Sequence, residues 1–192
     1  FCSGFFHPVI TLPSEGCDYG MEKSGAKIAI CPGSFDPVTI GHMDIINRAR
    51  KIFDHIIVAV LVNPEKHAAF TLEERIDLLK RCTKGMDDIE VVGFDGLLAD
   101  YAKIRNATAI VKGLRAMSDF EYEFQMALIN KKLNPDLETV YLNTTAENMF
   151  LSSSGVKQVA SFGGDISNFV PECILDDIKE RLCTGGKKNE RG

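Results

Sequence analysis

The stretch that most constrains the fold is CPGSFDPVTIGH, residues 31–42, because it separates two segments of different apolar period. Residues 27–30, KIAI, are short and rich in β-branched side chains, which predicts a strand. After the loop, apolar residues recur every three or four positions, as on the buried face of a helix: Met43, Ile46, Ala49 and Phe53. Residues 31–42 are therefore predicted to be the loop of a strand-to-helix crossover.

The composition of this loop favours an anion. Gly41 would let a ligand approach the backbone without a Cβ in the way, and prolines interrupt regular structure on the way to it. His42 stands where the helix is expected to begin, beside free backbone N–H groups and the positive end of the helix dipole. We interpret the loop as a phosphate site that carries an imidazole. An ordinary Gly/Pro loop with a surface histidine would show the same spacing.

Length and composition predict one globular domain and exclude some classes of function. The 192 residues are 45% hydrophobic and 26% charged, and the net charge of −5 argues against a general nucleic-acid binder. No apolar stretch reaches the roughly 18 residues of a membrane span. The six cysteines form no C-x-x-C pair, so neither a zinc site nor a disulfide framework is expected. Cys31 and Cys82 are interpreted as small buried hydrophobes in a reduced, cytoplasmic protein.

The two ends differ from the rest of the chain. Pro8 and Pro13 interrupt the apolar patch near the start, and no basic leader precedes it, so a signal peptide is not predicted. Met21 stands a few residues before the first strand, as an initiator would. We expect residues 1–25 to be an N-terminal extension outside the fold, residues 26–183 to be the domain, and residues 184–192 to be a flexible tail.

Strand-like and helix-like segments alternate along the domain. The predicted strands lie at residues 27–30, 55–62, 89–92, 108–111 and 138–142. Thr71 and Glu74 form the sequence pattern of a capping box for the helix after the second strand. Asp119 is expected to cap a long helix that is apolar on more than one face, which indicates deep burial or a subunit contact. The pattern predicts an α/β fold: a doubly wound, Rossmann-like, five-stranded parallel sheet with helices on both faces.

Polar and basic residues follow the strands at one edge of that sheet. Lys66 follows the second strand, Lys112 and Arg115 follow the fourth, and residues 152–154, three serines, follow the fifth. Taken singly, such a lysine is more often solvated and such a serine more often a helix cap. Ligands in these sheets bind at the carboxyl ends of the strands, so together they indicate a second phosphate site.

No nucleophile is evident, because no G-x-S-x-G elbow occurs and Cys31 lies at an apolar strand end. Helix N-termini, a histidine and cations favour catalysis by positioning and charge neutralisation. The sequence therefore points to phosphoryl or nucleotidyl transfer.

Three motifs resemble a known family. GSFDP at 33–37 followed by TIGH at 39–42 resembles the signature of the nucleotidyltransferase superfamily with a T/H-x-G-H motif. KGLRAMSDFEYE at 112–123 and LSSS at 151–154 resemble two motifs of the phosphopantetheine adenylyltransferase family within it. The resemblance covers roughly residues 27–182. Lys112 stands where the family commonly has arginine, which keeps the charge but loses a planar, two-pronged grip on phosphate.

The resemblance implies a reaction and its partners. ATP and 4′-phosphopantetheine would give dephospho-coenzyme A and pyrophosphate, with Mg²⁺ and by direct in-line attack without a covalent enzyme intermediate. It further implies a homohexamer and feedback inhibition by coenzyme A.

Roles carry over by position. The catalytic residues would be His42, Lys66 and Arg115. ATP would be bound by Ser34, Phe35, His42, Gly113, Arg115, Glu123, Ser152, Ser153 and Ser154. The acceptor would be bound by Ser34, Lys66, Leu97, Leu98 and Lys112.

Other functions stay open on these residues. Nicotinamide mononucleotide adenylyltransferase and glycerol-3-phosphate cytidylyltransferase belong to the same superfamily, and residues 112–123 argue against both. A nucleotide-sensing module that binds without turnover belongs to a different class. The combination of His42, Lys66 and Arg115 argues for an enzyme.

Overall fold

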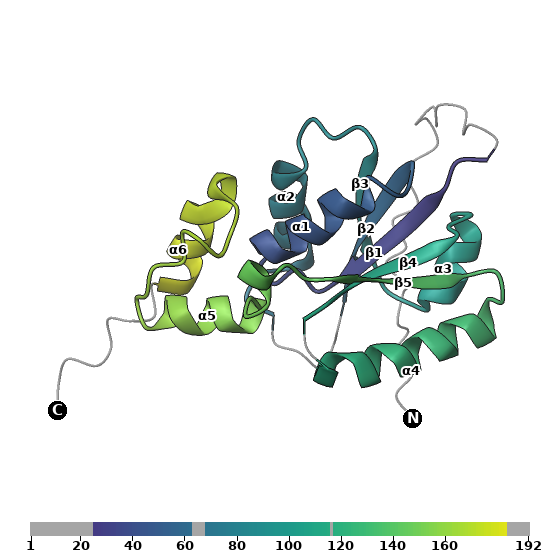
Figure 1. The fold of residues 1–192 in the computed structure, drawn as a ribbon. Helices are drawn as coiled ribbons and strands as arrows, with labels where there is room; N and C mark the ends of the chain where they lie inside the picture. The colour runs from purple at the N-terminus through teal and green to yellow at the C-terminus, as the bar shows by residue number, and fades with distance from the viewer. Residues whose placement is uncertain (1–24, 63–67, 116, 184–192) are drawn as a thin grey trace, which may run out of the picture.

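The computed structural model of the chain describes residues 25–62, 68–115 and 117–183 (Figure 1). Its sheet consists of β1 (Ile28–Gly33), β2 (His55–Leu61), β3 (Ile89–Phe94), β4 (Ala109–Leu114) and β5 (Glu138–Asn143). Each neighbouring pair is parallel, and the order is β3-β2-β1-β4-β5. The prediction of a five-stranded, doubly wound parallel sheet is confirmed. The predicted N-terminal extension and C-terminal tail lie almost wholly outside the described residues.

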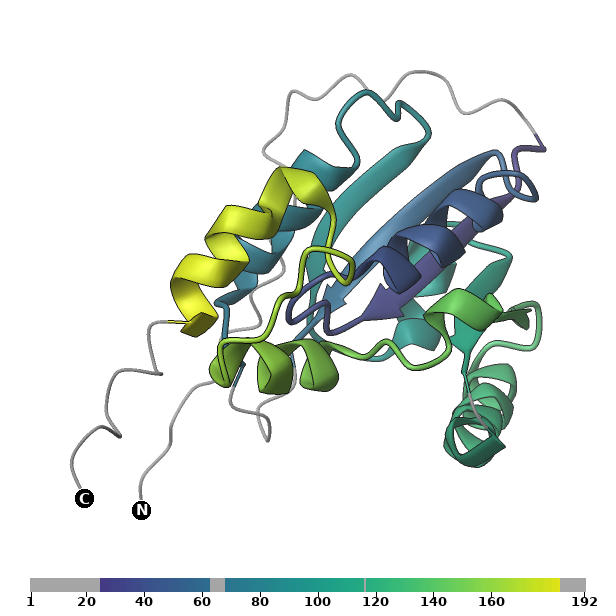
Figure 2. The same cartoon turned by 60° about the vertical axis from the view of Figure 1, so that its left-hand side comes forward.

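Helices cover both faces of this sheet (Figures 1 and 2). They are α1 (Ile40–Ala49), α2 (Leu72–Cys82), α3 (Leu98–Ile104), α4 (Met117–Leu133), α5 (Ser153–Ser161) and α6 (Leu175–Cys183), with 3₁₀ turns η1 (Ala146–Asn148) and η2 (Glu172–Ile174). The core on one face takes side chains from α1, α2, α5 and α6, and the core on the other face takes them from α3.

Alternation along the central strand explains why it reads as a continuous apolar run. Ala29 faces the first core and Ile30 the second, and both are fully buried. A strand that is covered on both sides has no solvent face on which polar residues could recur. Burying a side chain such as Ile30 contributes about 1.5–3 kcal/mol.

The sheet opens where β1 and β4 part. They pair through Ala29 with Ala109 and Ile30 with Ile110, whereas β1 stays paired with β2 as far as Gly33. Pro32 has no N–H to donate, so a strand can accept it where one neighbour has been lost. β1 therefore runs past the predicted residues 27–30, and a crevice opens at the switch point of the topology.

Helix α4 corrects one prediction and refines another. It begins at Met117, so Asp119 lies inside the helix and the prediction that Asp119 caps it was wrong. Five large apolar side chains of α4 are between 42% and 65% exposed: Tyr122, Phe124, Leu128, Ile129 and Leu133. Deep burial within this chain therefore does not explain the apolar width of the helix, and a subunit contact stays a prediction.

Among the described residues, no helix combines the length and the apolar character that crossing a bilayer requires.

Candidate active site

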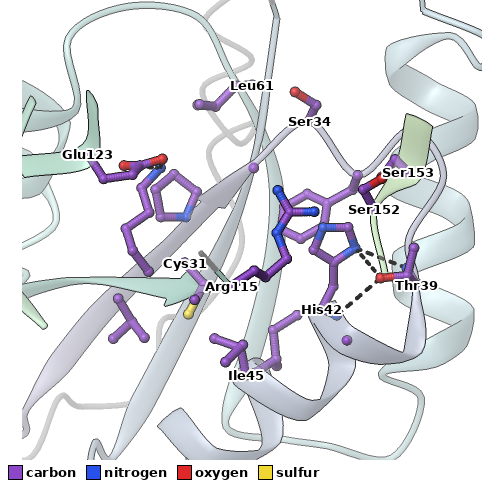
Figure 3. A pocket seen from close by; sticks show the side chains of 18 of the residues that line it. Cys31, Ser34, Thr39, His42, Ile45, Leu61, Arg115, Glu123, Ser152 and Ser153 are labelled. Carbon is purple, nitrogen blue, oxygen red and sulfur yellow. Dashed lines mark hydrogen bonds and ion pairs between the residues drawn. The ribbon is translucent and has the colours of Figure 1, made fainter. Parts of the chain in front are cut away.

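A cavity of about 740 Å³ lies at the carboxyl ends of the strands, where β1 and β4 separate (Figure 3). Most residues that the sequence assigned to a site line it: Ser34, Phe35, His42, Leu98, Lys112, Gly113, Arg115, Glu123, Ser152, Ser153 and Ser154. Leu97 is 58% exposed and is not among the lining residues. Lys66 lies outside the described residues. The residues that follow β1, β4 and β5 therefore line one crevice, as the sequence predicted.

The loop after β1 ends in a hydrogen-bonded cap that orients His42. Thr39 is the N-cap of α1, and its Oγ1 accepts a hydrogen bond from the backbone N–H of His42 at 3.3 Å. In return, the backbone N–H of Thr39 donates to Nδ1 of His42 at 3.0 Å, and Oγ1 lies 3.0 Å from the same nitrogen. Because Nδ1 accepts, the ring proton of a neutral imidazole sits on Nε2. Nε2 is therefore the hydrogen-bond donor that is left for a ligand.

The surroundings keep this imidazole uncharged. Burial, together with the smaller effect of the nearby positive charge of Arg115, lowers the pKa of His42 to about 4. Figure 3 shows both side chains in the same part of the pocket. The Phe35 ring meets the His42 ring edge-on at a centroid distance of 5.1 Å. At neutral pH His42 can donate a hydrogen bond to an anion but contributes no charge.

A buried carboxylate joins three segments around the pocket. Asp36 is 6% exposed and accepts hydrogen bonds from the backbone N–H groups of Ala69 and Phe70 at 3.0 Å each. Lys157, on α5, donates to the same carboxylate at 2.6 Å. The loop after β1, the segment just before α2 and helix α5 are thereby held together.

A buried guanidinium fixes the strand ends. Arg75 is 6% exposed, and its Nη1 donates to the carbonyl oxygen of Ser34 at 2.7 Å and to that of Leu61 at 3.1 Å. Its Nε donates to the carbonyl oxygen of Thr71 at 3.3 Å. Arg75 also lines the cavity, so its charge adds to the positive potential there.

The three serines at the start of α5 have different surroundings. Ser152 caps α5, since its Oγ accepts from the backbone N–H of Gly155 at 3.0 Å. Ser153 donates to the carbonyl oxygen of Pro37 at 2.8 Å, which ties α5 to the loop after β1. Ser154 is exposed at the cavity. A second helix N-terminus therefore opens on the same cavity, as predicted.

Two basic side chains, one on β4 and one just after it, already have partners within the protein. Lys112 Nζ lies 3.2 Å from a carboxylate oxygen of Glu123. Nη1 of Arg115 donates to the carbonyl oxygen of Leu151 at 2.9 Å. Between them, Gly113 is required by packing, because a Cβ there would lie 2.8 Å from Cγ1 of Ile45.

Sequence reasoning assigned no role in binding or catalysis to several residues that the structure brings to the cavity: Asp36, Thr39, Arg75, Asn130 and Lys157. Thr39 could have been found, because Thr-x-x-His has the spacing of a capping box with histidine in place of glutamate. The others contact residues far away in sequence or lie on a helix whose orientation the sequence leaves open.

The cavity contains no activated nucleophile among its described residues. Cys31 lines it, but burial raises the pKa of its thiol to about 12. Within the same part of the chain, no group of three or more His, Cys, Asp or Glu side chains could hold a metal ion. The arrangement suits transfer between two bound anions, with the protein supplying orientation and charge.

Comparisons with known proteins agree with this chemistry. The cytidylyltransferase-like family model matches residues 30–159. A nicotinic acid mononucleotide adenylyltransferase from Plasmodium falciparum, solved with NaAD, superimposes with a TM-score of 0.61 at 16% identity, covering 83% of this chain and 98% of that one. That likeness concerns the fold. Fold, site and family model together define a nucleotidyltransferase of the cytidylyltransferase-like class.

Closer relatives identify the family within this class. The phosphopantetheine adenylyltransferase of Caldanaerobacter subterraneus subsp. tengcongensis is 57% identical over 156 residues, which cover 81% of this chain and 98% of that protein. The enzyme of the same name from Clostridium tetani is 58% identical over 152 residues, covering 79% and 95%. The chain belongs to the phosphopantetheine adenylyltransferase family.

Proposed function

We propose that this protein transfers the adenylyl group of ATP to 4′-phosphopantetheine, which gives dephospho-coenzyme A and pyrophosphate. The observation that carries the proposal is its identity of 57% to a phosphopantetheine adenylyltransferase along nearly the whole of that enzyme. The cavity supports it, because two helix N-termini and Arg115 face a space large enough for two phosphorylated ligands.

The reaction we propose is a direct displacement at the α-phosphorus of ATP. A phosphate oxygen of the acceptor forms the new P–O bond while the bond to the β-phosphate oxygen breaks and pyrophosphate leaves. Nε2–H of His42 donates to the α-phosphate, where negative charge builds up as the bonds exchange. The neutral, Thr39-oriented imidazole supports this role, because its proton already stands on the correct nitrogen.

On the nucleotide side, Arg115 and the N-terminus of α5 with its serines hold the β- and γ-phosphates. Arg115 is fixed through the Leu151 carbonyl, directly before those serines. Glu123 and the backbone at Gly113 border the site of the nucleoside.

On the acceptor side, Ser34 and Lys112 bind the phosphate, with Leu98 against the pantetheine arm. Lys66 and Leu97 belong to this set by resemblance. Lys112 stays paired with Glu123 until an anion arrives, so acceptor binding exchanges one partner of the ammonium for another.

Mg²⁺ is part of the proposal as an ion that ATP brings with it. The described residues that line the cavity include two carboxylates, Asp36 and Glu123, and each faces a lysine. Such a donor set fits an ion held mainly by phosphate oxygens. When bound, it would neutralise charge on the triphosphate.

Assembly, inhibition and location follow the family in this proposal: a homohexamer in the cytoplasm, inhibited by coenzyme A. The exposed apolar side chains of α4 support self-association, because a surface of this kind is usually covered by a partner. Light scattering at micromolar concentration should give a mass several times 21.2 kDa. A monomer would refute the assembly without touching the activity.

The activity is tested by pyrophosphate release. ATP with 4′-phosphopantetheine should give steady turnover, whereas ATP alone should not. ATP with nicotinamide mononucleotide, and CTP with glycerol 3-phosphate, test the two sister activities. Turnover with either of these pairs but not with 4′-phosphopantetheine would overturn the assignment, and binding of ATP without turnover of any pair would leave the nucleotide-sensing module.

A further inference from the structure

Two cysteines that are distant in sequence meet away from the active-site cavity. Cys82 ends α2, Cys173 lies in η2, and their sulfur atoms are 3.7 Å apart. Neither is among the residues that line the cavity. The prediction that Cys82 is a buried hydrophobe needs correction, since it is half-buried and faces an exposed thiol.

We propose that Cys82 and Cys173 form a site of reversible thiol oxidation, which a low-molecular-weight disulfide converts into an intramolecular disulfide bond. The bond would join the end of α2 to the turn that precedes α6. This site is independent of the proposed transfer reaction.

The surrounding contacts keep the two sulfurs near each other. Arg81 donates to both carboxylate oxygens of Asp177 at 2.8 and 2.7 Å, and it also donates to the carbonyl oxygen of Cys173. Figure 2 shows α6 running beside α2 on this side of the molecule. The two sulfurs are 3.7 Å apart, so they need to approach by less than about 2 Å to reach bonding distance. The anchored backbones on both sides hold them within that range.

The chemistry balances as two successive exchanges. The exposed Cys173 thiol loses its proton, attacks one sulfur of the reagent disulfide and releases one reagent thiol. Cys82 then loses its proton, attacks the Cys173 sulfur and releases the second reagent thiol. The two cysteines are oxidised by two electrons in total, and the reagent disulfide is reduced to two thiols.

Burial sets the pace of the second exchange. In the reduced pair, burial and then the hydrogen bond with Cys173 raise the pKa of the Cys82 thiol to about 12, and burial, the larger cause, persists once Cys173 has reacted. Only thiolates attack disulfides, so ring closure should accelerate about tenfold for each unit by which the pH rises between about 7 and 9.

The cross-link would close a loop of 91 residues and so restrict the unfolded chain more than the folded one. Stabilisation of the size usually found for such bonds corresponds to a rise of about 5–15 °C in melting temperature. The helix fastened in this way is α6, the last element that the structure describes.

The test uses the full chain treated with oxidised glutathione at about pH 8.5. Mass spectrometry of the unreduced digest should find peptides of Cys82 and Cys173 joined with the loss of two hydrogens, together with the higher melting temperature. Dithiothreitol should reverse both effects.

Three variants make the result specific. Cys173→Ser alters an exposed side chain and should abolish the linked peptide and the temperature shift, and Cys82→Ser should do the same. Cys183→Ser, which changes a half-buried thiol at the end of α6, is the matched control and should keep both. A glutathione adduct that persists on Cys173 without a linked peptide, or a Cys173 cross-link between two molecules, would overturn the proposal.

Discussion

Helices α1 and α2 begin with the same hydrogen-bonded cap but carry different charges in it. Thr39 and His42 form the capping box of α1, and Thr71 and Glu74 form that of α2. The first turn of α2 contains two glutamates, Glu73 and Glu74, whereas the first turn of α1 contains no acidic residue. Carboxylates offset the positive end of the α2 dipole, and α1 leaves its positive end to the cavity. One local geometry thus serves stability in α2 and, in the proposed mechanism, anion binding in α1.

The largest effect expected from this difference is on catalysis. His42→Ala should lower kcat by about 10²–10³-fold with little change in either KM, because the lost hydrogen bond acts mainly in the transition state. Glu74→Ala is the matched control and should leave kcat within about twofold while it lowers the melting temperature. Steady-state pyrophosphate release measures both. A kcat for His42→Ala within a few-fold of the unsubstituted protein would erase the functional contrast between the caps.

Lys112 sharpens the comparison between the two helix ends, because it would bind an anion through a charged side chain instead of a helix N-terminus. This side chain is already paired with Glu123. Lys112→Ala should weaken binding of 4′-phosphopantetheine by about 10- to 100-fold, since an ionic hydrogen bond is worth roughly 1.5–3 kcal/mol. ATP binding should change much less, and Lys112→Arg should keep acceptor affinity near or above its original value. Calorimetric titration of each ligand decides. Equal weakening of both ligands, or of neither, would place Lys112 elsewhere than on the acceptor phosphate.

The two caps should also lose stability in different pH windows. His42 has its folded pKa lowered from 6.5 to about 4, so the unfolded chain binds more protons between these values and stability falls as the pH drops from 6.5 toward 4. Partial solvent access reduces the expected loss to about 1–2 kcal/mol. The pKa of Glu74 is lowered from 4.5 by its hydrogen bond from Thr71, so its contribution is present above pH 4.5 and is lost only below it.

Urea unfolding at several pH values separates these two terms. His42→Asn should flatten the dependence between pH 6.5 and 4 and leave the lower window unchanged. Glu74→Gln should do the reverse. A variant of His42 with the original slope would show that the histidine is not desolvated in the folded protein.

The smallest expected effect concerns the cap hydroxyls. Thr39→Val and Thr71→Val each remove one cap and should lower stability by about 0.5–2 kcal/mol. Thr39→Val should in addition lower kcat by about 3- to 10-fold, because the imidazole loses one of the two groups that orient Nδ1. Thr39→Ser should restore both properties. If Thr39→Val and Thr71→Val behaved alike in kcat, Thr39 would be a cap and nothing more.

Local patterns carried the predictions that hold in the structure. The strands, the crossover loop and the capping box at Thr71 depend on neighbours in sequence, and His42 could be singled out because it closes a motif of adjacent residues. The wrong assignment at Asp119 has a local cause too, since helices begin within a residue or two of several acceptable caps.

Long-range pairings could not be predicted in this way. The partners Asp36 and Lys157 are 121 positions apart, and the thiols of Cys82 and Cys173 are 91 apart. No periodicity links such residues, because their proximity depends on the order of the strands and the rotation of the helices. Leu97 and Leu98 show the same limit on a small scale: one step at the start of α3 leaves the first exposed and brings the second to the cavity.

The carboxylate of Asp36 has a consequence for the order in which the chain assembles. Its backbone donors lie 33 and 34 positions further along, and its ammonium partner lies 121 positions further along. Contacts of such separation cost more chain entropy to close than local contacts do. On the ribosome, β1 and β2 can pair long before Lys157 has been synthesised. The pocket can therefore close only after α5 has been synthesised, and until then the Asp36 carboxylate lacks its counter-charge.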